Sequence, residues 1–160
     1  EKKKMGSAKF EVLVVEDLDS PRDIICAFVE HIGYPTVRGV NSADRALKEL
    51  EADPSHFQCV ITDINMPGLN GKQLIELIRK HKKLQHLPIV VLTAYGTADN
   101  LIECLDAGAS GFLVKPPTKA SLNRELGRAM RLIQNNENPR LVKAGDAAQL
   151  REILATKGFQ

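Results

Sequence analysis

Three runs of consecutive apolar residues constrain the fold of this chain more than any other feature. They occupy residues 12–15, 60–62 and 89–92, and β-branched side chains dominate them. An unbroken run of this kind is typical of a strand that is buried on both faces, as in a parallel sheet covered by helices. Weaker patterns at residues 35–40 and 111–114 predict two further strands, the first at an edge of the sheet because it contains a proline.

Helical patterns follow each of these strands. Apolar residues three or four positions apart mark buried helix faces, and the predicted faces include Ile24, Leu77 and Ile133. The expected helix starts are Ser20-Pro21, Ser42, Gly71, Ala98 and either Thr118 or Ser121. Five strands that alternate with five helices predict an α/β fold with a parallel sheet and right-handed crossovers.

Length and composition limit the remaining organisation. A chain of 160 residues is long enough for one domain and a short extension. We expect residues 1–9 to be a leader, residues 10–137 to form the domain, and residues 138–160 to form a helical extension or linker. The apolar runs are too short to span a bilayer, and the tail lacks a nucleic-acid-binding pattern. Three widely spaced cysteines predict neither a disulfide framework nor a zinc site, which fits a reducing cytoplasm.

Polar residues gather where the predicted strands end. The first strand ends at Glu16 and Asp17, the central strand at Asp63, the fourth at Thr93 and the fifth at Lys115. Each has an ordinary explanation by itself, since acids are common in turns and at helix starts. In a parallel sheet, however, these ends share one edge, where open α/β sheets place their ligands. We therefore interpret the set as a functional site.

The residue types at this edge point to phosphoryl chemistry with a metal ion. Three adjacent carboxylates repel one another and need a cation, and oxygen ligands favour Mg²⁺, which usually bridges to a phosphate. Lys115 is suited to neutralise an incoming phosphoryl group, Thr93 can donate a hydrogen bond to it, and Ala94 leaves room for its approach. Asp63 is then the candidate nucleophile that forms an acyl phosphate.

Four motifs in the same order resemble the receiver domain of two-component response regulators. They are V-V-E-D at 14–17, I-T-D-I-N-M-P-G-L-N-G at 61–71, L-T-A at 92–94 and G-A-S-G-F-L-V-K-P at 108–116. The resemblance covers residues from about Phe10 to Asn135. It implies a flavodoxin-like, doubly wound fold whose five-stranded parallel sheet has the strand order 2-1-3-4-5.

The resemblance also implies a metal site. Asp63 would be the phosphoacceptor, and Asp17 and Asp63 would bind Mg²⁺ through their side chains. Asn65 would bind the ion through its backbone carbonyl, and Glu16 would reach it mostly through water.

On the phosphoryl side, the resemblance implies that Thr93 and Lys115 contact the phosphoryl oxygens, with Asn65 and Ala94 beside them. The bond between Lys115 and Pro116 would be cis, an isomer that proline allows at little cost.

Two aromatic residues have expected regulatory roles. The resemblance implies that Phe112 is a switch aromatic that would respond to movement of Thr93, although a plain core phenylalanine is the alternative. Tyr95 is bulky and follows Thr93 closely, so we expect it to shield the acyl phosphate from water and slow its loss.

The resemblance implies a signalling switch and not a turnover enzyme. The phosphodonor would be a histidine kinase or a phosphotransfer protein, and the fourth helix, fifth strand and fifth helix would form the surface that changes. A downstream output domain, a protein partner or a homodimer would read that surface. Two alternatives stay open: a Mg²⁺-dependent phosphohydrolase, for which Asn65 cannot supply the second acid, and a binding module that is never phosphorylated.

Overall fold

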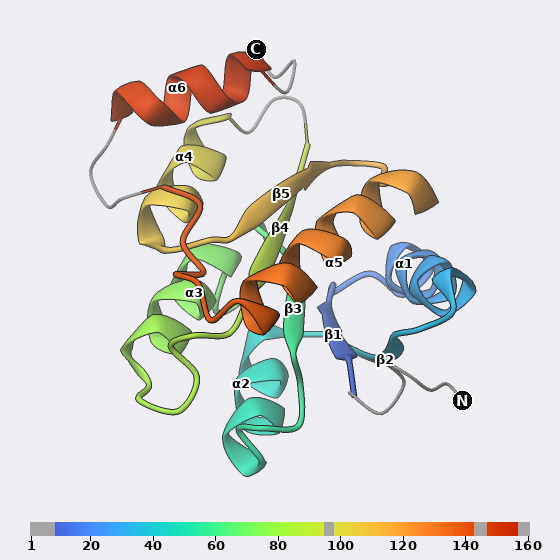
Figure 1. Cartoon of the computed structure of the whole chain (residues 1–160). Coiled ribbons are helices and arrows are strands. Elements are labelled where there is room, and N and C mark those ends of the chain that lie inside the picture. Colours follow the sequence, from blue (N-terminus) through green and yellow to red (C-terminus); the bar gives the residue numbers. More distant parts are fainter. Residues whose placement is uncertain (1–8, 95–97, 143–146, 157–160) are drawn as a thin grey trace.

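Five parallel strands form one sheet in the order β2-β1-β3-β4-β5 (Figure 1). The computed structural model describes residues 9–94, 98–142 and 147–156. The strands are β1 (Glu11–Val15), β2 (Thr36–Val40), β3 (Cys59–Asp63), β4 (Ile89–Thr93) and β5 (Gly111–Val114). The predicted strands are therefore confirmed, and so is the flavodoxin-like strand order that the resemblance implied. The expected leader, apart from Lys9, lies outside the described residues.

Helices cover both faces of the sheet. They are α1 (Asp19–Ile32), α2 (Ala43–Ala52), α3 (Gly71–Lys80), α4 (Ala98–Ala107), α5 (Lys119–Gln134) and α6 (Ala147–Thr156). Helices α1 and α5 lie on one face, α2, α3 and α4 lie on the other, and α6 packs against α4 (Figure 1). In the described stretches, no helix is long and apolar enough to cross a membrane.

Alternate side chains of each strand enter two separate apolar cores. Leu13 and Val15 of β1 pack with residues of α2, α3 and α4, whereas Val12 and Val14 pack with residues of α1 and α5. This division arises because successive side chains of a strand point to opposite faces of the sheet. All four are 0% exposed. The unbroken apolar run in the sequence is thus the signature of a strand with a core on each side.

Side-chain caps begin two helices as predicted. Ser42 accepts a hydrogen bond from the backbone N–H of Arg45 at the start of α2. At the start of α5, Thr118 and Ser121 cap each other reciprocally, so both predicted candidates contribute. Such caps satisfy backbone N–H groups that have no partner within the helix.

The predicted start of α1 at Ser20 is wrong. The helix begins at Asp19, and the preceding Leu18 provides no side-chain cap. The backbone N–H of Arg22 already bonds to the carbonyl of Leu18 at 3.1 Å. Because this bond closes the first helical turn, Ser20 lies inside that turn and cannot precede it.

Three residues expected on buried helix faces are exposed. Ile24 is 53% exposed, Ile133 is 41% exposed and Leu77 is 39% exposed. Ile24 and Leu77 each stand one position before a buried residue of the same helix. Since adjacent helical residues diverge by about 100° around the axis, only one of each pair can occupy the centre of the buried stripe.

Candidate functional site

The carboxyl edge of the sheet brings the predicted acidic residues and the predicted lysine together. Glu16 and Asp17 follow β1, Asp63 ends β3, and Lys115 follows β5. In-register parallel pairing carries all these strand ends to one edge. One carboxylate oxygen from each of Glu16, Asp17 and Asp63 lies within 4.8 Å of the other two. We name these three residues the acidic cluster.

Glu16 is fully buried within the acidic cluster. It is 0% exposed, and its Oε2 accepts a hydrogen bond from the backbone N–H of Leu18 at 3.3 Å. Its Oε1 accepts no hydrogen bond from the described part of the chain, although Lys115 Nζ lies 3.4 Å away. Burial, followed by the negative charge of Asp63, raises the pKa of Glu16, and Lys115 opposes this only in part. A buried carboxylate oxygen in this condition is unfavourable unless a further cation approaches it.

Lys115 brings one positive charge to the acidic cluster. Its Nζ lies 3.0 Å from Asp63 Oδ2, and the predicted cis bond to Pro116 is present. Burial alone would lower the pKa of Lys115, but its hydrogen bond to Asp63 and the charges of Asp63 and Glu16 raise it. Lys115 is therefore protonated at neutral pH, and its ammonium contacts Asp63 and Glu16 within a cluster of three carboxylates.

A glycine at the start of α3 allows the backbone of Asp63 to lie where it does. Gly71 donates its N–H to the carbonyl of Ile64 at 2.8 Å, and a Cβ on Gly71 would lie 2.5 Å from the carbonyl oxygen of Asp63. Any other residue would collide with this backbone. Asn70 completes the turn, because its side chain accepts a hydrogen bond from the N–H of Gln73. The Asn-Gly pair of the motif thus positions the loop after Asp63.

The other predicted residues lie around the same edge. Thr93 is 1% exposed, and its hydroxyl donates to the carbonyl of Ala94 at 3.2 Å. Ala94 and Asn65 are exposed on the loops that follow β4 and β3. Phe112 is 2% exposed and packs in the core beside α4, a place that suits a core aromatic and a switch aromatic alike. Tyr95 lies outside the described residues.

Sequence reasoning missed Asn100, which belongs to the first turn of α4. Its side-chain amide donates to the side-chain oxygen of Asn65 at 3.2 Å. The bond ties the start of α4 to the loop that follows Asp63. The sequence carries no signal for it, because Asn100 has the pattern of an ordinary polar residue on a helix surface.

Sequence reasoning also missed an apolar hollow beside the acidic cluster. The hollow has a volume of about 350 Å³, and Pro21 and Ile24 of α1 line it together with Pro116 and Pro117. Lys115 and Glu16 form its polar wall. An apolar surface therefore adjoins the charged site directly.

The donor set of the acidic cluster fits the metal ion that the resemblance implied. Each member offers a carboxylate oxygen, and the cluster contains neither histidine nor cysteine. Hard cations such as Mg²⁺ prefer such all-oxygen sets. Two of the three carboxylates are buried, where like charges repel strongly without a cation between them.

The fold and this site define the class of the protein: a flavodoxin-like α/β domain with an acidic site at the carboxyl edge of its sheet. Residues 12–127 match the family model described as the response regulator receiver domain. The chain belongs to this family, whose members function in phosphorylation-dependent two-component signalling.

Two curated relatives of this chain are chemotaxis proteins. Chemotaxis protein CheY-3 of Vibrio cholerae serotype O1 is 33% identical over 118 residues, which cover 74% of this chain and 89% of that protein. Chemotaxis protein CheY of Pseudomonas aeruginosa is 32% identical over 116 residues, which cover 72% of this chain and 92% of that protein. The similarity therefore spans nearly the whole of each relative.

Solved structures show the same similarity. A receiver domain protein from Clostridium thermocellum has a TM-score of 0.74 at 27% identity and covers 79% of this chain and 98% of its own. A second solved structure is the receiver domain of a sensor histidine kinase from Pseudomonas aeruginosa PAO1, with magnesium coordinated in its active-site cleft. It has a TM-score of 0.70 at 29% identity, and the match covers 78% of this chain and 99% of that one. Receiver domains are phosphoacceptor switches that bind Mg²⁺ in an acidic pocket and interact with histidine kinases or phosphotransfer proteins.

Proposed function

We propose that phosphorylation of Asp63, in a reaction that requires Mg²⁺, switches this receiver domain. The observation that carries the proposal is the 3.0 Å contact between Lys115 Nζ and Asp63 Oδ2 inside the acidic cluster. Asp63 is 6% exposed. The low exposure of Asp63 limits the access of water to its carboxylate. The ammonium of Lys115, which would neutralise charge on the phosphoryl group, already lies beside this nucleophile.

The acidic cluster would hold the metal ion. Asp17 and Asp63 would contribute side-chain oxygens, Asn65 its backbone carbonyl, and Glu16 would act mostly through water. When bound, Mg²⁺ neutralises charge on the phosphoryl oxygens during transfer. The buried Oε1 of Glu16, which accepts no hydrogen bond from the described residues, supports this assignment.

The transfer exchanges one bond for another. A carboxylate oxygen of Asp63 bonds to phosphorus while the bond from phosphorus to the donor's imidazole nitrogen breaks, leaving its electron pair on that nitrogen. The ammonium of Lys115 moves its contact from the Asp63 carboxylate to a negatively charged phosphoryl oxygen. Ala94 and Asn65 lie beside the phosphoryl group. The hydroxyl of Thr93 turns from the Ala94 carbonyl to another phosphoryl oxygen, because hydrogen bonds to ionised acceptors are roughly twice as strong as neutral ones.

The phosphodonor would be a histidine kinase or a phosphotransfer protein. The apolar hollow formed by Pro21, Ile24, Pro116 and Pro117 supports a protein donor, because it offers a contact surface next to Lys115. A donor that packs there would bury the exposed side chain of Ile24 and would bring its phosphorylated imidazole to Asp63.

The output surface would be formed by α4, β5 and α5. Phe112 lies on β5, which pairs with the strand that carries Thr93, and it packs in the same core as residues of α4. A movement of Thr93 would therefore change the position of Phe112 and, through it, the output surface. A downstream output domain, a protein partner or a second copy would read it. The switch would reset by slow autodephosphorylation, which Tyr95 retards; Tyr95→Ala should accelerate the loss of phosphoryl group.

Incubation with acetyl phosphate and Mg²⁺, followed by intact-mass measurement, tests the proposal. We expect one phosphoryl group on the wild type, and none on Asp63→Asn or in the presence of EDTA. Label on Asp63→Asn would contradict the assignment of the acceptor. Repeated turnover of a phosphate ester would favour the phosphohydrolase, and complete absence of label would favour a module that is never phosphorylated.

A further inference from the structure

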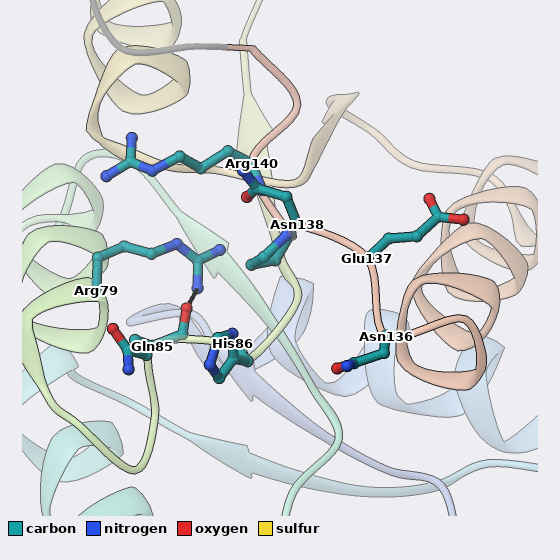
Figure 2. Close-up of a pocket in the computed structure, with 8 residues that line it drawn as sticks. Arg79, Gln85, His86, Asn136, Glu137, Asn138 and Arg140 are labelled. Carbon is teal, nitrogen blue, oxygen red and sulfur yellow. Dashed lines mark hydrogen bonds between the residues drawn. The ribbon is translucent and has the colours of Figure 1, made fainter.

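The chain continues past α5 and returns to the α4 side of the sheet. The backbone N–H of Leu141 donates to the carbonyl of Ala109 at 2.8 Å, and Arg140 Nη1 donates to the carbonyl of Asp106 at 3.2 Å. A cavity of about 500 Å³ separates residues 136–140 from the loop between α3 and β4 (Figure 2). This return segment is therefore attached by these hydrogen bonds and by Val142, which is buried in the core beside α4, while a cavity borders residues 136–140.

Helix α6 then packs against α4. Leu150 and Leu154, one helical turn apart, are 1% and 6% exposed, and both belong to the apolar core that includes Leu101 and Leu105 of α4. Helix α6 exposes polar side chains such as Glu152 on its other side. Ile102 of α4 and Ile153 of α6 are partly buried against the same core. The apolar side chains that α4 shares with this core therefore form a surface, here called the α4 surface, that accepts an amphipathic helix through residues at i and i+4.

We propose that this α4 surface is a helix-binding site which α6 occupies in the unphosphorylated protein and leaves when Asp63 is phosphorylated. The inference rests on the proposed function. Released α4 would then be open to a helix of the same amphipathic kind from a partner.

A hydrogen bond connects the loop of the phosphorylation site to α4. Asn100, in the first turn of α4, donates to Asn65 in the loop after Asp63. This bond holds the start of α4 in the position to which α6 is docked. At the end of the neighbouring strand β4, the hydroxyl of Thr93 donates to the carbonyl of the adjacent Ala94.

The direction of the coupling follows from these bonds. A phosphoryl group on Asp63 is a stronger acceptor for the Thr93 hydroxyl than the Ala94 carbonyl is. Phosphorylation would therefore break the Thr93 bond at the end of β4 and place new charge beside Asn65, whose bond to Asn100 favours the present position of α4. Because coupling between two sites is reciprocal, loss of α6 docking should in turn favour the phosphorylated state.

Whether α6 is helical indicates whether it is docked on α4. The helix has 10 residues, fewer than the roughly 12–15 that an isolated helix needs to be even marginally stable in water. When α6 leaves α4, its helical structure should therefore melt, and its backbone amides should exchange with solvent faster.

Hydrogen exchange on the full chain tests the inference, with Mg²⁺ and beryllofluoride as a stable mimic of the aspartyl phosphate. We expect exchange in α6 to accelerate at least about fivefold on addition of the mimic, in the range of typical allosteric couplings. Asp63→Asn, treated identically, should show no acceleration. Unchanged or slower exchange in α6 of a wild type that binds the mimic would overturn the inference while leaving the proposed function intact.

A double variant tests the reciprocal effect. Leu150→Ala with Leu154→Ala should raise the affinity for beryllofluoride by about fivefold, whereas the matched control Glu152→Ala, on the exposed side of α6, should not change it. A thermal denaturation curve verifies that the double variant remains folded. An unchanged or reduced affinity in the folded double variant would overturn the coupling, and absence of binding in the wild type would overturn the proposed function together with it.

Discussion

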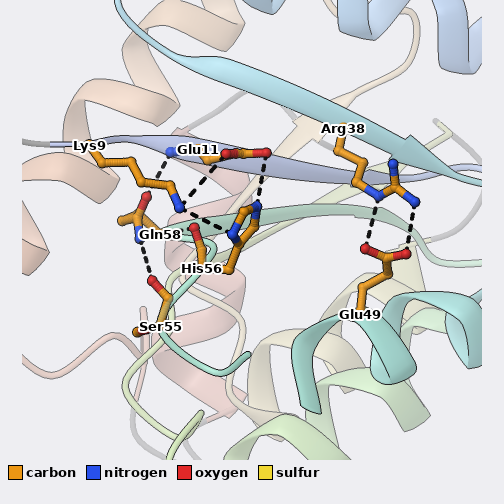
Figure 3. A network of polar contacts seen from close by, with 7 residues as sticks. All are labelled: Lys9, Glu11, Arg38, Glu49, Ser55, His56 and Gln58. Carbon is orange, nitrogen blue, oxygen red and sulfur yellow. Dashed lines mark hydrogen bonds and ion pairs between the residues drawn. The ribbon is translucent and has the colours of Figure 1, made fainter. Parts of the chain in front are cut away.

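Two polar clusters at opposite edges of the sheet differ in how their charges are matched. At the amino edge, Glu11 lies 3.3 Å from His56 Nε2, and Lys9 Nζ lies 3.2 Å from His56 Nδ1 and 3.9 Å from Glu11 (Figure 3). Gln58 accepts a hydrogen bond from the backbone N–H of Glu11 at 2.7 Å. We name Lys9, Glu11, His56 and Gln58 the amino-edge network. At the carboxyl edge, Lys115 contacts two members of the acidic cluster, Glu16 and Asp63, and the third carboxylate, that of Asp17, lies beside them.

The difference shows which kind of polar cluster marks a functional site. The side chain of Glu11 is 18% exposed and has partners on both sides, so the amino-edge network is a balanced structural feature of small energetic weight. Glu16 is 0% exposed and lies among excess negative charge. Such an arrangement costs stability, and perturbed carboxylates of this kind concentrate at functional sites. Unmatched buried charge, and not the density of charged residues, distinguishes the two edges.

The largest expected difference between the edges is in phosphorylation rate. Lys115→Met should slow labelling by acetyl phosphate about 100-fold, because it removes a positive charge aimed at the developing phosphoryl charge. Lys9→Met, the matched change in the amino-edge network, should leave the initial rate unchanged. The initial rates of labelling are measured by intact mass. Equal effects of the two substitutions would mean that the carboxyl edge is no more important for phosphorylation than the amino edge.

Removal of the half-buried Arg79 should affect stability without affecting the chemistry. Arg79 donates hydrogen bonds to the carbonyls of Gly108, Gln85 and Leu87, of which Gln85 is drawn in Figure 2. Burial lowers the pKa of Arg79 to about 10. Arg79→Ala should cost about 2 kcal/mol of unfolding free energy, because the partly buried carbonyls of Gly108 and Leu87 lose their donor.

Urea denaturation measures the stability loss of Arg79→Ala, and the exposed neighbour in Lys80→Ala serves as the control. The folded fraction of Arg79→Ala should take up phosphoryl label at the wild-type rate. A slower rate would mean that this distant side of the domain contributes to the chemistry.

Neutralising one glutamate at each edge should change stability in opposite directions. In the presence of EDTA, Glu16→Gln should stabilise the protein by about 1 kcal/mol, because it relieves repulsion within the acidic cluster. Glu11→Gln should destabilise it by up to about 1 kcal/mol, the usual upper range for an accessible ion pair. The two unfolding free energies are compared with and without Mg²⁺. Addition of Mg²⁺ should stabilise the wild type and Glu11→Gln more than Glu16→Gln, and equal responses would argue against the assigned metal site.

The smallest expected effect is a pH dependence at the ion pair between Arg38 and Glu49. Arg38 donates two hydrogen bonds to Glu49, at 2.9 and 2.8 Å (Figure 3), and this lowers the pKa of the carboxyl. A lowered folded pKa means that the pair stabilises the protein at neutral pH and loses this contribution as the pH falls through that pKa. Unfolding free energies of the wild type and Glu49→Gln should therefore differ at pH 7 and converge below pH 4.5. A constant difference across this range would exclude the pair as its source.

The strands and the residues of the acidic cluster could be predicted because their signals are local. The apolar runs of β1, β3 and β4 exclude any environment other than a core on both faces, and the acids follow those runs directly in the sequence. The exposure of Ile24 and Leu77 could not be predicted in this way. Helical periodicity identifies a stripe of apolar residues, but the width of the stripe that is actually buried depends on the packing of the neighbouring elements.

By itself, the sequence determined the order of the buried strands and the chemical types at their ends, because burial and strand termination are set by neighbouring residues. Tertiary structure alone decided that Asn100 bonds to Asn65, that an apolar hollow adjoins Lys115, and that α6 covers α4. These contacts join residues far apart in the chain. Their existence depends on how the complete sheet and its helices close around the core, which no local pattern encodes.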